Sequence, residues 1–163
     1  MHEFNISENE LKTAIDFFSN NDIEVLTVQS IKINQSQPNF SAVVLALEMH
    51  GLDRSKVEDI LESIFVVYYA QTELRQRIIN QISFGQIKKN IKWFEEFIRY
   101  YNDEKQIGSN DLLSIKFIRD NVVLDFALNT LRNLFIDSTK IPREVVFSYF
   151  SLLKAIEIGA EKG

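Results

Sequence analysis

Three Ser-x-x-Glu or Ser-x-x-Gln motifs precede stretches in which apolar residues recur every three or four positions. They begin at Ser7, Ser55 and Ser83. In such a capping box the serine side chain accepts a hydrogen bond from the first turn of a helix, and the Glu or Gln side chain accepts one in return. Apolar residues at this spacing fall on one face of an α-helix. Each motif therefore predicts a helix start, and together they favour an all-helical chain.

Few residues interrupt these patterns. The chain of 163 residues holds five glycines and two prolines, which argues against a loop-rich β-sandwich. We expect an all-α fold, a single-domain bundle of five or six helices over residues 1–163. One helix is expected over residues 55–83 without a break, and another over 111–135. A short helix is expected at residues 40–50, ended by Gly51 in the left-handed conformation.

Residues 23–33, with the sequence IEVLTVQSIKI, allow two interpretations. Six of these eleven residues are β-branched, which favours a strand. No second strand is evident, and a lone strand leaves its own backbone hydrogen-bonding groups unpaired. The segment is therefore either helical or irregular, which we favour, or one short strand that pairs with its own copy across a dimer.

The composition excludes several chemistries. The absence of cysteine excludes disulfides, thiolate metal sites and cysteine nucleophiles. Only two histidines are present, and no P-loop or G-x-S-x-G motif occurs. We therefore predict a non-enzymatic protein with no catalytic residue, no cofactor and no metal. No apolar run is long enough to span a membrane, and the first residues lack the features of a signal peptide. We expect no membrane partner and a cytoplasmic location, unless a cleaved leader is missing from the sequence.

The stretch GLDRSKVEDIL, residues 51–61, is the one motif-like signal. A helix, a glycine turn and a second helix follow one another here, as in a helix-turn-helix unit. A DNA-associated regulator built on residues 40–62 is therefore the alternative function, with Arg54, Ser55 and Lys56 as its DNA contacts. However, residues 1–70 hold four basic and eleven acidic side chains, which repel phosphate groups. A plain helical corner is favoured, and nucleic acid is not an expected partner.

Charged residues form two further patterns. A basic segment with interleaved aromatic residues, 75–100, is typical of single-stranded nucleic-acid binding, but its aromatics recur at helical spacing and are assigned to the core. Paired carboxylates can perform acid–base chemistry when burial separates their pKa values. The pairs in this chain are Glu58/Glu62, Glu95/Glu96 and Asp120/Asp125. We place the first pair on the polar side of its helix.

Three apolar surfaces together exceed what we expect one chain of this length to bury. The segment FVVYYA, residues 65–70, is apolar on all sides, and the helix over 111–135 has two nearly opposite apolar faces. An aromatic stripe widens the apolar face of a third helix. We therefore predict a two-fold homodimer, and as the function a helical interaction or regulatory protein that self-associates and binds an unknown protein partner. The candidate self-association residues are Trp93, Phe97, Tyr100, Ile115, Val122 and Phe126.

Overall fold

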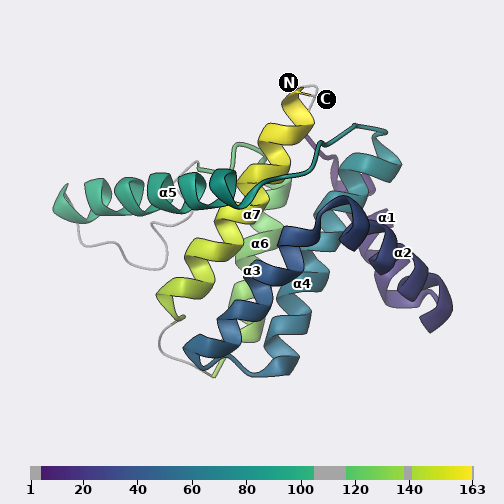
Figure 1. Ribbon diagram of the computed structural model, residues 1–163, viewed down its shortest axis with the longest axis horizontal. Coiled ribbons are helices and arrows are strands. Elements are labelled where there is room, and N and C mark those ends of the chain that lie inside the picture. Colours follow the sequence, from purple (N-terminus) through teal and green to yellow (C-terminus); the bar gives the residue numbers. More distant parts are fainter. Residues whose placement is uncertain (1–4, 105–116, 138–140, 163) are drawn as a thin grey trace.

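The computed structural model describes residues 5–104, 117–137 and 141–162, and within these ranges the chain forms seven α-helices (Figure 1). In chain order they are α1 (Glu8–Asn20), α2 (Ile23–Ser36), α3 (Pro38–Leu45), α4 (Arg54–Tyr69), α5 (Phe84–Glu104), α6 (Asn121–Leu134) and α7 (Arg143–Lys162). A 3₁₀ turn, Ala46–His50, follows α3, and a π-helical turn, Ala70–Leu74, follows α4. The described ranges contain no strand. The all-α class is confirmed, with more helices than the five or six predicted.

Helix α4 lies at the centre of the fold, in contact with α1, α3, α6 and α7. The segment FVVYYA falls in its C-terminal half, where Phe65, Val66 and Val67 are buried, so its predicted enclosure is confirmed. Helix α5 packs along α7 and extends to one side of the body, whereas α1 and α2 lie on the opposite side (Figure 1). Buried apolar side chains from all seven helices form one continuous cluster.

Aromatic rings join α5 to α7. The ring centroid of Phe94 lies between 4.9 and 5.5 Å from those of Phe117, Phe147 and Phe150. Such edge-to-face and stacked pairs stabilise a core beyond the area that they bury. Nearby, Tyr149 is fully enclosed, and burial raises the pKa of its hydroxyl to about 12. The tyrosine therefore stays protonated at neutral pH.

Two of the three predicted capping boxes mark real helix starts. Ser7 Oγ accepts a hydrogen bond from the Glu10 backbone N–H at 3.1 Å, and Glu10 Oε1 accepts one from the Ser7 N–H at 2.9 Å. Ser83 Oγ accepts from the Gln86 N–H at 3.1 Å, at the start of α5. The Gln86 side chain donates instead to Asn90, so this second box is only half formed.

The third predicted box, at Ser55, is wrong. Helix α4 is capped two residues earlier by Asp53, whose carboxylate accepts from the Lys56 N–H at 2.9 Å. Asp and Ser are about equally favoured as N-caps, so the motif alone did not discriminate between them. The α-helix predicted at 40–50 ends at Leu45, and Gly51, in the predicted left-handed conformation with a φ of 87°, ends the 3₁₀ turn that follows, with Leu52 buried beyond it.

The unbroken helix predicted over residues 55–83 is also wrong. Helix α4 ends at Tyr69, the π-helical turn follows, and residues 75–83 form no regular secondary structure. Gln76 has a φ of 55°, which an α-helix cannot accommodate. Ile78, expected on the buried face of that helix, is exposed.

Two side-chain amides fix this connection. Gln37 is fully buried, and its amide oxygen accepts from the Ile82 N–H at 2.8 Å while its nitrogen donates to the Asn80 carbonyl at 2.9 Å. Asn39 donates to the Ile82 carbonyl at 2.8 Å. These bonds satisfy backbone groups that a helix would otherwise pair internally.

Residues 23–33 lie within helix α2, so the favoured interpretation is confirmed and the strand alternative is wrong. Asp22 caps this helix by accepting a hydrogen bond from the Val25 N–H at 3.0 Å. The short connection from α1 thus ends in a strong helix-start residue. Six β-branched residues are compatible with a helix because their preference for strands is small and depends on context.

In the described part of the helix predicted over 111–135, residues 117–120 are not helical and α6 begins at Asn121. The carboxylate of Asp120 caps α6 by accepting from two N–H groups of its first turn, and it also accepts from the Ile6 N–H at 2.6 Å. Burial raises the pKa of this carboxyl group, although the hydrogen bonds oppose the shift. Phe117 is buried but lies in a turn before the helix. Residues 105–116 lie outside the described part of the chain.

Candidate interaction surfaces

Three adjoining pockets hollow the face formed by α1, α4 and α6. One of about 380 Å³ lies between α1 and α6, one of about 250 Å³ lies among α1, α4 and α6, and one of about 350 Å³ lies between α4 and the first half of α2. The first two pockets share Ile15 and Phe126, and the last two share Phe18 and Glu62. The three pockets therefore adjoin one another, and together they are called here the acidic groove.

Carboxylates set the electrostatics of the acidic groove. No lysine or arginine of the described ranges lines any of the three pockets. Among the described residues, none forms an ion pair or a hydrogen bond with any of the groove's carboxylates, whereas Glu10 pairs with Arg75 and Glu157 with Lys154. Uncompensated negative charges in a concave surface make the local electrostatic potential strongly negative. The five carboxylates are Glu8, Glu58, Asp59, Glu62 and Asp125.

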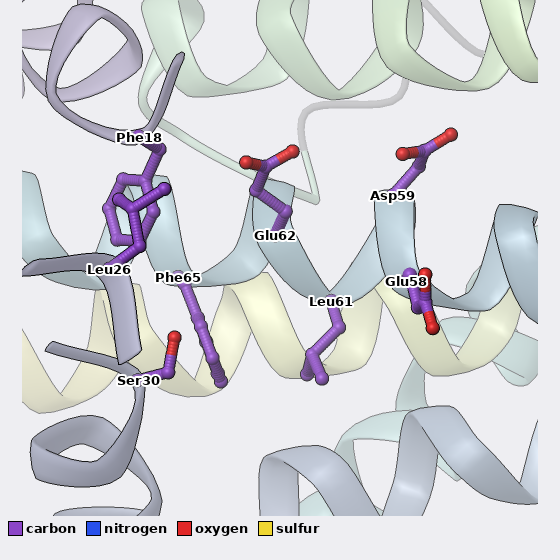
Figure 2. A pocket seen from close by; sticks show the side chains of 8 residues that line it. All are labelled: Phe18, Leu26, Ser30, Glu58, Asp59, Leu61, Glu62 and Phe65. Carbon is purple, nitrogen blue, oxygen red and sulfur yellow. The ribbon is translucent and has the colours of Figure 1, made fainter. Parts of the chain in front are cut away.

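Figure 2 shows the part of the groove between α4 and α2. Asp59 and Glu62 point to one side of α4, and Leu61 and Phe65 point to the other. Phe18 lies at one end of this pocket. Partial burial, with a smaller contribution from the neighbouring Asp59 charge, raises the pKa of Glu62. This part of the groove therefore combines a partly desolvated carboxylate with an apolar floor.

Two of the predicted self-association residues line the acidic groove. Val122 and Phe126 are half-buried and face Leu11 and Ile15 of α1. The second apolar face of α6 is thus covered in part by a helix of the same chain.

The other predicted self-association residues do not form one described patch. Trp93 is half-exposed on α5, with its ring 5.1 Å from that of Phe117, and Phe97 packs half-buried against the core. Ile115 and the side chain of Tyr100 lie outside the described residues. Self-association itself stays a prediction.

The three predicted DNA contacts lie at the start of α4. Arg54 forms an ion pair with Glu48, and Ser55 is exposed beside it. The Lys56 ammonium lies 4.9 Å from the centroid of the Phe135 ring. Because four other helices surround α4, most of its length cannot enter a major groove. The DNA-binding alternative therefore has no support.

Helix α2 carries a surface that the sequence analysis missed. Only Ile33 of this helix is fully buried. Val28 and Ile31, one turn apart on the same side, are 68% and 51% exposed. They define what is called here the outward face of α2. Ile23 and Val25 are also exposed. In the sequence, this surface is indicated by aliphatic residues that are spread around the whole helix and do not lie in one stripe.

Within the described ranges, no group of three or more Asp, Glu or His side chains is placed to hold a metal ion. None of their helices is both long enough and apolar enough to cross a membrane.

Comparison with known proteins gives one informative likeness. The chain is 29% identical, over 119 residues, to cilia- and flagella-associated protein 57 C of Tetrahymena thermophila. The match covers 71% of this chain but only 9% of the Tetrahymena protein. No family model and no solved structure matches the chain.

Proposed function

We propose that this chain is a non-enzymatic helical interaction domain that self-associates. The observation that carries the proposal is the outward face of α2. Burying a Val or Ile side chain contributes about 1.5–3 kcal/mol, so two side chains one turn apart make a useful contact. A second copy of α2 presents the same residues, which is the arrangement that a two-fold interface requires.

The likeness to the Tetrahymena protein supports an interaction role. That protein is more than ten times longer than the matched segment, as the 9% coverage implies. We propose that the present chain contributes a helical module to a protein assembly, as a structural or regulatory component. For its location, the likeness adds the cilium or flagellum as an alternative to the predicted cytoplasm.

Light scattering coupled to gel filtration tests self-association. At about 100 μM the wild-type protein is expected to be a dimer, because oligomers form by mass action. The variant Val28→Glu/Ile31→Glu is expected to be a folded monomer with an unchanged circular dichroism spectrum. The matched control Leu45→Glu/Ile136→Glu places charges at exposed aliphatic positions elsewhere and should remain a dimer.

A wild-type monomer at this concentration would overturn the proposal. If the α2 variant remained dimeric, the proposed location would be wrong. Trp93→Glu then tests the exposed aromatic residue of α5, which the sequence analysis had selected.

A further inference from the structure

The acidic groove has the shape of a site for an extended partner. Its three pockets, of about 250 to 380 Å³, are each at or below the lower end of the ~300–1,000 Å³ typical of small-molecule sites. They adjoin one another along a surface to which four helices, α1, α2, α4 and α6, contribute. An amphipathic helix that lies in a groove and inserts successive side chains uses such a surface.

The floor of the groove supplies apolar contacts. Ile15 and Phe126 are half-buried where the first two pockets meet, and Leu61 is half-buried in the third. Each exposes part of its side chain to the groove and packs the rest against the core. A partner that covered them would bury apolar area without rearranging the fold.

The charges of the groove select the kind of partner. Five carboxylates line it without a cation from the described part of the chain, so nucleic acids and anionic lipid surfaces are repelled. Lysine and arginine side chains are attracted, and their positive charges would offset the cost of the partial desolvation of the Glu62 carboxylate.

From this geometry we propose that the acidic groove binds a basic amphipathic helix of a partner protein. Its apolar side chains contact Ile15, Phe126 and Leu61, and its lysines or arginines pair with Asp59, Glu62 and Asp125. The groove is separate from the outward face of α2. The proposal therefore does not depend on self-association.

A synthetic helical peptide provides the probe. It has about five helical turns (~18 residues), leucine at positions i, i+3, i+4 and i+7, lysine or arginine at most other positions, and a fluorescent label. Fluorescence anisotropy is measured with the wild-type protein and with the variant Val28→Glu/Ile31→Glu, in which the α2 contact is removed. Both proteins should bind the peptide equally, and raising NaCl from about 0.05 to about 0.5 M should weaken binding.

Two control peptides separate the charge of the probe from its pattern. One keeps the leucines and replaces every cation with glutamate, and it should not bind. The other has the original composition in scrambled order, and it should bind at least tenfold more weakly, since it cannot place its leucines on one face. Equal binding of either control peptide would overturn the proposal.

Matched protein variants place the site. Glu58→Gln/Asp59→Asn/Glu62→Gln removes three groove charges and is expected to weaken peptide binding about tenfold, or 1.4 kcal/mol. Glu96→Gln/Asp137→Asn/Glu161→Gln makes the same chemical changes at exposed positions that line none of the three pockets, and should leave affinity within about twofold. If both triple variants lose affinity equally, or neither does, the proposed site is wrong.

The oligomeric state of the variants tests whether a second copy of this chain, and not a partner helix, occupies the groove. Helix α5 exposes Lys88, Lys89 and Lys92, so a second copy of this chain also carries a basic surface. If the groove variant, but not the α2 variant, became monomeric in light scattering, the groove would bind a second copy. That result would overturn the assignment to a partner helix.

Discussion

Helices α2 and α7 have about the same average hydropathy, but α7 buries ten of its 20 residues and α2 buries one of its 14. The buried residues of α7 include the unbroken run 149–156, so this part of the helix is enclosed on all sides. The apolar residues of α2 are spread around the helix. Helix α7 also lies against both α4 and α5, whereas α2 packs chiefly on α3.

This contrast shows that the helices packed around it, not the amount of apolar side chain, determine what a helix buries. Helix α7 even encloses Lys154, whose ammonium lies 2.6 Å from a Glu157 carboxylate oxygen and close to the Trp93 ring. An enclosed helix can therefore accommodate a paired charge, while an unenclosed one leaves aliphatic side chains in water.

The largest expected effect compares one aliphatic residue from each helix. Leu152→Ala should lower the free energy of unfolding by about 2–5 kcal/mol, because it leaves a cavity in the core. Val28→Ala should change it by less than about 0.5 kcal/mol, since the side chain is exposed. Urea denaturation of monomeric protein at low concentration measures both. An equal loss of unfolding free energy in the two variants would contradict the difference drawn between α7 and α2.

A comparison of helix caps should give a smaller difference. Asp120→Ala is expected to cost about 2 kcal/mol, because the buried Ile6 N–H and the first turn of α6 lose their acceptor. Asp22→Ala, at the exposed cap of α2, should cost about 0.5–1 kcal/mol. The same denaturation experiment compares the two. A larger loss at Asp22 would mean that α2 is held more firmly than its exposure indicates.

The close approach of α7 to residues 75–83 gives the next test. A Cβ added at Gly159 would lie 2.6 Å from Ile79 Cγ2, so Gly159→Ala should cost about 1–3 kcal/mol through overpacking. Gly85→Ala is the control, since a Cβ there would meet only Ser83 Oγ, at an ordinary contact distance of 3.7 Å. It should be neutral or slightly stabilising by about 0.5 kcal/mol. Ile79→Ala removes the clashing methyl group, so it should suppress the Gly159→Ala loss in the double variant.

The smallest expected effect on stability is that of a substitution at Glu62, on the side of α4 that α2 leaves partly uncovered. Glu62→Gln should raise stability at pH 7 by less than about 0.5 kcal/mol, because folding raises the pKa of Glu62 and so disfavours its charged form. As the pH falls through that raised pKa the wild-type carboxylate takes up a proton, and the difference narrows. The difference in stability should vanish below pH 4.5, the ordinary pKa of a glutamate. Thermal melts at several pH values measure the difference in stability between Glu62→Gln and the wild type. A difference that grew in acid would contradict the raised pKa of Glu62.

Local patterns predicted the helices but not their interruptions. The capping box at Ser7 needs only residues within one turn, so it can be recognised in the sequence. The break after Tyr69 depends on Gln37 and Asn39, which are distant in the chain, so residues 55–83 looked like a continuous helix.

The groove was only partly predictable for the same reason. Val122 and Phe126 stood out because they lie opposite the main apolar face of their helix, and both line the groove. Glu8 and Asp59 carried no such signal. Only the packing of α1 against α4 and α6 brings them to one surface.

The buried amide of Gln37 also constrains how this protein can change its length. Connections between helices usually tolerate insertions, because little depends on the position of each residue. Here Gln37 pairs with the carbonyl of Asn80 and the N–H of Ile82, and Asn39 pairs with the carbonyl of Ile82. One residue inserted after Asn80 would leave buried partners of Gln37 unmatched. We therefore expect related sequences to vary here by substitution at exposed positions such as Ile78, while the number of residues between α4 and α5 stays constant.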